Sequence, residues 1–223
     1  FLKFFITIII INKLINKQRK ILLFTMFSLF SKNFLNDLWA NLQILASIDD
    51  LQSNEVIIES KSGILIDALL KINYPNFKNK KVSNINKFLE HILYDEKESQ
   101  LTKFELIEDS HNMKWIILND ENPHNLFSSM YTVINALLSN NSIKSIIGFV
   151  IKVTINYKNI HNEKIYIIYR MDTKSFYPFC STSDEIGEQD REKENLVYNF
   201  LKENKFKLEN NKKKWLGIWG IPF

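Results

Sequence analysis

Cysteine, glycine and histidine are scarce in this chain of 223 residues, which contains one, five and four of them. Because Cys180 is alone, no internal disulfide can form, and the composition suits a reducing compartment. Its neighbours offer no cation that would lower the pKa of the thiol, so we expect an unreactive side chain at the end of a strand. Five glycines are too few for a phosphate-binding loop, and neither GxGxxG nor GxxxxGKS/T occurs. These routes to nucleotide binding are therefore excluded.

The chain also lacks the residue spacing of a metal or catalytic site. Its histidines are isolated from one another and from Cys180, so neither a zinc site nor an HExxH motif can be written down. No GxSxG elbow is present. We therefore expect a protein that is not an enzyme and that binds no metal or cofactor. We expect surface or turn positions for His91, His111, His124 and His161.

Six acids cluster where a helix is predicted to begin. We expect them to be solvated, because carboxylates at a helix start interact favourably with the positive end of the helix dipole. The alternative is an acidic surface for a partner. The six are Asp184, Glu185, Glu188, Asp190, Glu192 and Glu194.

Positive charge is concentrated at the start of the chain. The net charge is +4, but residues 1–25 hold five basic residues and no acid, which leaves −1 for the remainder. The basicity therefore gives no support to nucleic-acid binding by the folded part. We interpret residues 1–25, ahead of Met26, as a leader outside the domain. An over-extended start, a signal or membrane anchor, and a helix packed on the domain remain open for it.

The apolar run in this leader is shorter than the roughly 20 residues that a membrane-spanning helix needs. A secretory signal would also have its charge first and a small-residue cleavage site last, which the leader does not. We therefore expect a cytoplasmic protein, with action at the inner face of the membrane as a further option.

Hydrophobic periodicity predicts a single α+β domain over residues 26–223. We expect an antiparallel sheet built from hairpins, with helices mainly on one face, and two related halves that share the sheet remain an option. Apolar residues at helical spacing predict helices over 27–42, 85–93, 123–138 and 187–204. Alternating residues predict a hairpin across Ser60–Gly63, a second across Asp109–Asn112, a strand from Ile147 to Tyr157 with one buried face, its partner after Asn159–Asn162, and a strand from Phe176 to Cys180.

The end of the chain carries a family resemblance. A strand runs into Phe176-Tyr177-Pro178-Phe179, a charged helix follows, and the chain closes with Trp215-x-x-x-Trp219-Gly220-x-Pro222. Together with the order of the preceding elements, these residues resemble the PspAB type of phage-shock PspA-associated protein, over roughly residues 26–223. The resemblance implies an accessory protein of a PspA-type envelope-stress system, whose central protein is a coiled-coil membrane-remodelling scaffold. An HtpX-type membrane protease is a second implied partner, and no catalytic residue is carried over.

The closing block also supplies the candidate partner-binding residues. We expect Tyr177, Trp215 and Trp219 to contact a protein partner and the neighbouring lysines to supply charge. The alternative is that all three aromatic side chains belong to the core. Lysines beside interfacial aromatics also suit anionic lipid headgroups, so peripheral membrane binding through this block and the 27–42 helix stays open. An enzyme of unrecognised type would need a polar pocket of convergent titratable groups. The candidates are Tyr177, Lys212, Lys213, Lys214, Trp215 and Trp219.

Overall fold

The computed structural model describes residues 32–49, 55–67, 85–93, 102–109, 113–139, 145–158, 160–182, 187 and 189–223. The chain divides into two compact units, Phe1–Leu38 and Trp39–Phe223. Within the first unit, only residues 32–38 are described, and they are helical. The predicted leader, residues 1–25, lies outside the described residues. The fold below is that of the second unit.

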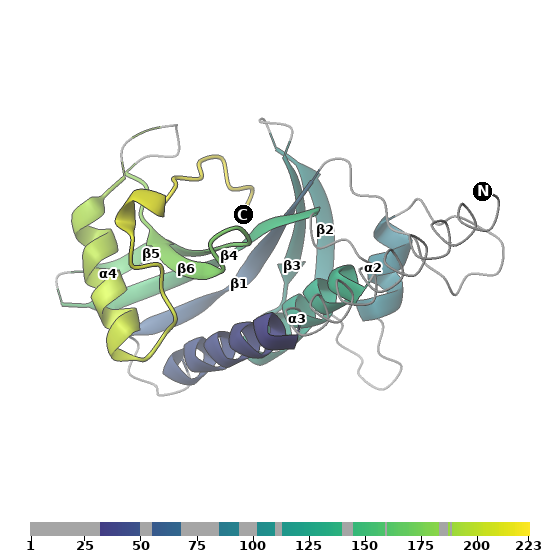
Figure 1. The fold of residues 1–223 in the computed structure, drawn as a ribbon, viewed down its shortest axis with the longest axis horizontal. Coiled ribbons are helices and arrows are strands. Elements are labelled where there is room, and N and C mark those ends of the chain that lie inside the picture. Colours follow the sequence, from purple (N-terminus) through teal and green to yellow (C-terminus); the bar gives the residue numbers. More distant parts are fainter. Residues whose placement is uncertain are drawn as a thin grey trace, which may run out of the picture. The chain divides into compact units, whose positions relative to one another are not determined.

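The described strands form one antiparallel sheet of six strands in the order β2-β3-β1-β4-β5-β6 (Figure 1). The hairpins β2–β3, β4–β5 and β5–β6 are each formed by neighbours in the sequence, and β1 lies between β3 and β4. The predicted α+β class with an antiparallel sheet is confirmed. The strands are β1 (Val56–Ile66), β2 (Lys103–Glu108), β3 (Lys114–Asn119), β4 (Ile146–Tyr157), β5 (Ile160–Arg170) and β6 (Ser175–Phe179).

Helix α3 (Pro123–Ser139) begins where the sequence predicts. The side-chain Oδ1 of Asn122 accepts hydrogen bonds from the backbone N–H groups of His124, at 2.9 Å, and Asn125, at 3.2 Å. Pro123 occupies the first turn, where a missing N–H leaves no hydrogen bond unmade. The apolar stripe of this helix is fully buried: Leu126, Phe127, Met130, Val133, Ile134, Leu137 and Leu138.

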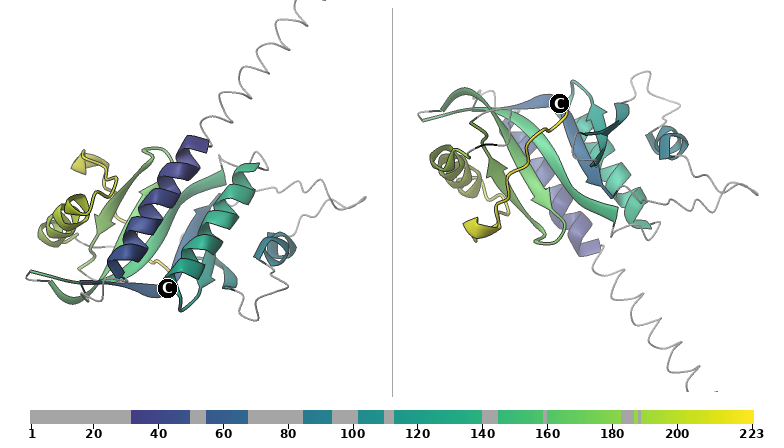
Figure 2. Two further views of the ribbon diagram at one scale, coloured as in Figure 1. Left: turned by 90° about the horizontal axis from the view of Figure 1, so that it is seen from below. Right: turned by 90° about the horizontal axis from the view of Figure 1, so that it is seen from above.

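The helical residues 39–49 and α3 lie along the same face of the sheet, which we call the helix face (Figure 2). Trp39 and Tyr131 meet edge to face between these helices, with ring centroids 5.2 Å apart. Within the sheet, the ring of Phe149 in β4 stacks on the ring of Tyr169 in β5, with centroids 4.5 Å apart. Helix α2 (Ile85–Leu93) contacts α3, and α4 (Arg191–Glu203) lies beside β6. The predicted placement of helices mainly on one face therefore holds for α3 and residues 39–49.

The opposite face of the sheet, which we call the outer face, is also buried at its centre. Trp115, Val150, Ile168 and Tyr177 come from four different strands and are each at most 1% exposed. The last residues of the chain cross this face (Figure 2). Farther along β4, Lys152 and the other side chains of the outer face are partly exposed, as predicted for that strand.

The first predicted hairpin is wrong. Residues Ser60–Gly63 lie inside β1, which runs without a turn from Val56 to Ile66. Ser62 pairs with Leu118 of β3 on one side and with Ile151 of β4 on the other. Where the turn was predicted, the pairing of β1 with β4 shows a register shift between Ile58 and Ser62, which is typical of a β-bulge. Pairing on both edges therefore outweighs the local turn preference, while the predicted continuation beyond Asp67 lies outside the described residues.

Two further boundaries and the burial of one residue differ from the prediction. Strand β5 begins at Ile160, which is buried, so the connection from β4 is shorter than the predicted 159–162 turn. Helix α4 begins at Arg191, because the side chain of Asp190 caps it by accepting the N–H of Lys193 at 3.0 Å. Ile147, predicted to be buried, is 41% exposed near the start of β4.

The second predicted hairpin is confirmed as β2–β3, although residues 110–112 lie outside the described residues. Asp109 stabilises its connection. One carboxylate oxygen accepts the backbone N–H of Met113 at 2.9 Å, and the other accepts the indole N–H of Trp115 at 2.8 Å. The short polar side chain therefore closes the connection and also orients a large core residue.

Candidate functional site

The chain after α4, residues 204–223, forms what we call the closing segment. It first runs along the free edge of β6, where the N–H of Glu209 donates to the carbonyl of Phe176 at 2.7 Å. A 3-10 turn, Lys212–Lys214, follows. The remaining residues cross the outer face and end near its middle (Figure 2). The predicted partner-binding residues lie on this segment, except Tyr177, which lies beneath it.

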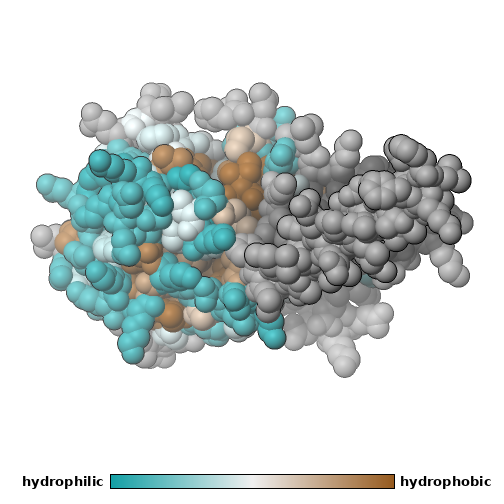
Figure 3. Space-filling model, in the orientation of Figure 1, coloured by the Kyte–Doolittle hydropathy of each residue, from teal (hydrophilic) through white to brown (hydrophobic). Residues whose placement is uncertain are grey.

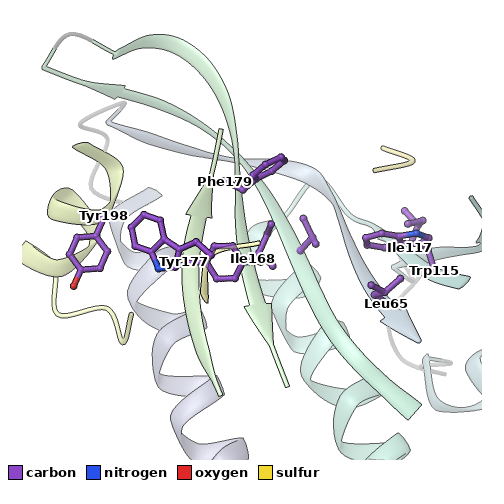
Figure 4. Close-up of a cluster of buried hydrophobic side chains, with 9 residues drawn as sticks. Leu65, Trp115, Ile117, Ile168, Tyr177, Phe179 and Tyr198 are labelled. Carbon is purple, nitrogen blue, oxygen red and sulfur yellow. The ribbon is translucent and has the colours of Figure 1, made fainter. Parts of the chain in front are cut away.

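Tyr177, which lies among the buried side chains shown in Figure 4, anchors the middle of the closing segment together with Trp215. Their rings stack with centroids 6.2 Å apart and an interplanar angle of 15°. The hydroxyl of Tyr177 donates to the carbonyl of Leu216 at 2.9 Å, and the indole N–H of Trp215 donates to the carbonyl of Glu209 at 2.9 Å. Burial raises the pKa of the Tyr177 hydroxyl well above its ordinary value. Both side chains are buried, so a partner could reach them only if the closing segment moved.

The final residues continue across the sheet. Trp219 meets Phe179 edge to face with centroids 5.6 Å apart. Phe223 meets the rings of Trp115, at 6.2 Å, and Tyr166, at 6.5 Å. The carbonyl oxygen of Phe223 also accepts the hydroxyl of Tyr166 at 3.4 Å. The segment therefore bridges β6, β5 and β3 through aromatic side chains.

The three lysines of the turn are exposed, in contrast to the aromatic residues beside them. Lys212 bonds to the side-chain oxygen of Asn195, and its ammonium lies 5.8 Å from the ring centroid of Trp215. The ammonium of Lys214 lies 3.8 Å from a carboxylate oxygen of Glu209. Leu216, two residues farther on, is 51% exposed. Hydrophilic residues cover this side of the molecule around α4, with apolar residues reaching the surface between them (Figure 3).

One of the acids predicted to be solvated is buried. Glu194 has no exposed surface, and its carboxylate accepts the backbone N–H of Cys180 at 3.2 Å and the guanidinium of Arg191 at 2.8 Å. Burial raises the pKa of this carboxyl, and the Cys180 N–H and Arg191 oppose that rise. The prediction is wrong here because Glu194 shares the helix face of Val197 and Leu201, a spacing of three and four residues that indicates burial. Of the other five, Asp190 caps α4, Glu192 is exposed, and Asp184, Glu185 and Glu188 lie outside the described residues.

Arg191 joins the Glu194 site to the closing segment. Its second guanidinium nitrogen lies 3.5 Å from the carbonyl oxygen of Trp215. On the other side of β6, Arg170 pairs with Asp172 and donates to the carbonyl of Lys214 at 2.7 Å. The two arginines thus hold the backbone of the segment on both sides of its anchoring tryptophan. Neither arginine was among the predicted site residues.

The chemistry at Cys180 follows the prediction. The side chain is buried directly after β6. Burial, with a contribution from the nearby Glu194 carboxylate, raises the pKa of the thiol, so the nucleophilic thiolate is disfavoured. Within the described ranges, no three His, Cys, Asp or Glu side chains come together to hold a metal ion. His91, His124 and His161 are exposed as predicted, and His111 lies outside these ranges.

The structure therefore separates the predicted site residues into two groups. Tyr177 and Trp215 are buried and Trp219 is partly buried, while the Lys212–Lys214 turn is exposed to solvent. Phe223 was not among the candidates, although it lies at the centre of the outer face. Its partner Gly63 was interpreted as part of a turn, and no periodic signal in the last nine residues could have indicated which strand they cross.

A comparison with protein families matches residues 41–223 to PspAB, PspA associated protein B. The chain belongs to this family. The match begins within the helix over residues 39–49 and includes the whole sheet and the closing segment. It covers the aromatic closing block and the elements before it from residue 41 onward, whereas residues 26–40, which the resemblance also included, lie outside the match. Searches of curated proteins and of solved structures found no match.

Membership of the PspAB family links the chain to PspA as a protein partner. Of the helices that the structure describes in this PspAB protein, none combines the length and the apolar character needed to cross a bilayer.

Proposed function

We propose that this PspAB protein is a non-enzymatic adaptor that binds a PspA-type coiled coil in an envelope-stress response of the phage-shock kind. The match to the PspA-associated family over residues 41–223 is the observation that carries the proposal. We place the protein in the cytoplasm, at the inner face of the membrane where such a scaffold acts. An HtpX-type membrane protease is the other partner that family resemblance suggests.

The Lys212–Lys214 turn with Leu216 is the contact surface that we propose. Three exposed lysines flank an exposed leucine within five residues, so charge and an apolar anchor lie side by side. The flanking positions of coiled coils often carry glutamates, with which lysines can pair, and a leucine can enter the space between two helices. Beneath the turn, Trp215 and the two arginines fix its backbone, which lowers the entropy lost on binding.

Co-purification from the native host tests this proposal. The tagged wild-type protein should retain PspA, and a variant with Lys212→Glu, Lys213→Glu and Lys214→Glu should lose it. A matched control exchanges three exposed lysines elsewhere, Lys87→Glu, Lys158→Glu and Lys205→Glu, and should retain it. If PspA fails to co-purify with the wild-type protein, the adaptor proposal is wrong. If the wild-type protein and the turn variant both retain PspA, the proposed contact surface is wrong.

A second candidate function is peripheral membrane binding through the same turn. The exposed Leu216 beside three exposed lysines supports it, because such a surface can insert one apolar side chain among anionic headgroups. Flotation with anionic liposomes distinguishes the two. A membrane-binding turn should carry the protein upward at low salt and release it at high salt, where screening weakens attraction to the surface. A protein that stays in the lower fraction at low salt contradicts this second function.

A further inference from the structure

Lysines from four strands line the end of the outer face that the closing segment leaves open, away from the Lys212–Lys214 turn. Lys103 of β2 and Lys61 of β1 both pair with Asn119 of β3, so they lie on either side of it. Lys152 of β4 lies opposite the bulge that residues 59–61 form between the Ile58–Val153 and Ser62–Ile151 pairs, and the charge of Lys61 acts on it there. Lys164 of β5 lies two residues beyond Tyr166, the partner of Lys152, and belongs to the same face as its own partner, Thr154. We call these four residues the lysine row.

Alternation along the strands fixes this row on the outer face. Gly63 and Val150 face the closing segment, because Phe223 contacts Gly63 and Val150 belongs to the buried cluster there. Lys61 and Lys152 are each two residues away and so point to the same side. The closing segment ends beside the row, where the carbonyl oxygen of Phe223 bonds to Tyr166. All four lysines keep exposed surface.

The positive charges of the row are poorly neutralised. Among the described residues, no ion pair involves Lys61, Lys103, Lys152 or Lys164. The pKa of Lys152 is lowered by partial burial and by the like charges of Lys164 and Lys61, and the carboxylate of Glu59 only partly opposes this. Holding like charges at neighbouring positions of a sheet is destabilising unless an anionic group pairs with them.

An apolar side chain lies in line with Lys164, across β4. Ile57 of β1 is 43% exposed and pairs with Thr154, which in turn pairs with Lys164. An exposed apolar residue bordered by lysines is suited to a partner that is amphipathic as well as acidic.

We propose that the lysine row, with Ile57, is a docking surface for an α-helix of a partner protein that carries a stripe of acidic residues. Strands lie about 4.8 Å apart, so Lys103, Lys61 and Lys152 are spaced at about 0, 10 and 14 Å across the sheet. Acids at positions i, i+7 and i+11 of a helix face one side and lie at about 0, 10.5 and 16.5 Å along its axis. Flexible lysine side chains span the remaining difference.

The same face carries acids, which favours a protein over a uniformly anionic partner. Glu59 accepts the hydroxyl of Thr154 at 2.6 Å inside the patch, and Glu105 lies two residues from Lys103 on the same face. An anionic bilayer would be repelled by these carboxylates wherever it met them. A helix can place its own polar or basic residues opposite them. The inference goes beyond the proposed function, because it assigns a second surface and holds whether or not the Lys212–Lys214 turn binds a coiled coil.

Binding of two synthetic alanine-rich helices to the full chain tests this inference. One carries glutamates at i, i+7 and i+11, and the other carries the same number at i, i+5 and i+9, which spreads them around the helix. We expect the striped peptide to bind at least about 10-fold more tightly in fluorescence anisotropy at low salt, since several exposed pairs of up to about 1 kcal/mol act together. Equal binding of both peptides, or no saturable binding of the striped one, would overturn the proposal.

Lysine variants locate the site. A variant with Lys61→Gln, Lys103→Gln, Lys152→Gln and Lys164→Gln should bind the striped peptide at least about 10-fold more weakly, because each lost pair contributes a factor of up to about 5. Glutamine keeps much of the side-chain length and removes the repulsion within the row, so the fold should be retained, as a urea midpoint checks. The variant Ile57→Ser should weaken binding about 3-fold through the lost apolar contact.

The control variant is Lys212→Gln, Lys213→Gln and Lys214→Gln, which should change the affinity for the striped peptide less than about 2-fold. An equal loss in this variant would place binding at the turn and overturn the assignment to the sheet. A final experiment measures binding to phosphatidylserine vesicles. If vesicles bind with the same dependence on the lysine row and the striped peptide does not bind, the occupant is a membrane and the helix proposal is wrong.

Discussion

The ring of Phe223 occupies the space that a side chain at Gly63 would need. A Cβ placed on Gly63 would lie 2.6 Å from Cε1 of Phe223 and 3.0 Å from Cε3 of Trp115. The missing side chain in the middle of β1 therefore lets the end of the chain approach the sheet.

We expect Gly63→Ala to destabilise the protein by about 1–3 kcal/mol, because the new methyl group forces Phe223 away from the sheet. Urea unfolding measures the loss. The same substitution in a Phe223→Ala background should cost clearly less, since the ring that collides is gone. An equal cost in both backgrounds would show that the two residues are not coupled.

The two closing tryptophans should differ in their response to phenylalanine. Trp215→Phe removes the indole bond to the carbonyl of Glu209 and should cost about 1–3 kcal/mol. The buried indole nitrogen of Trp219 has no hydrogen-bond partner within the described chain, so Trp219→Phe removes no bond and should cost less. Thermal or urea unfolding of both variants makes the comparison, and a larger loss at Trp219 would contradict it.

Glu194 should make the stability depend on pH. Its pKa in the folded protein is raised above the ordinary value of 4.5, chiefly by burial, so the folded state binds the proton more tightly than the unfolded state. Its contribution is therefore fully present below pH 4.5 and declines as pH rises through the folded-state pKa. As pH rises from 4.5, we expect the free energy of unfolding of the Glu194→Gln variant to increase relative to that of the wild type.

Glu192→Gln is the matched control for this pH profile. Glu192 lies in the same first turn of α4 but is exposed. Both substitutions remove one negative charge, so only the difference between their profiles reports burial. A Glu194→Gln profile that runs parallel to that of Glu192→Gln would contradict the raised pKa.

Cys180 should resist thiol reagents while the protein is folded. Its side chain is buried and its pKa is raised, so labelling requires β6 and α4 to separate. We expect the rate of reaction with a disulfide reagent near pH 8 to be at least about 100-fold lower than in urea, because only rare openings expose the thiol. As the chain has one cysteine, the signal is unambiguous. Rapid, complete labelling of the folded protein would show that this part of the core is open.

Local sequence patterns predicted those elements whose stability arises from near neighbours in the chain. Asn122 and Pro123 mark the start of α3 because cap and first-turn positions make short-range demands. The β2–β3 hairpin was predictable because Asp109 bonds within a few residues of itself. The helical spacing of Glu194 also indicated burial, but its charge argued the other way, and only the presence of Arg191 and the Cys180 N–H shows how that charge is satisfied.

The sequence by itself determined the α+β class, the family and the presence of an aromatic closing block. The tertiary structure alone decided that Ser60–Gly63 lies within a strand, that Tyr177 and Trp215 are buried while Lys212–Lys214 stay exposed, and that lysines from β1, β2, β4 and β5 form one row. The physical reason is that periodicity reports which face of an element is apolar. What lies against that face depends on strand order and register, which are set by pairings between residues far apart in the chain.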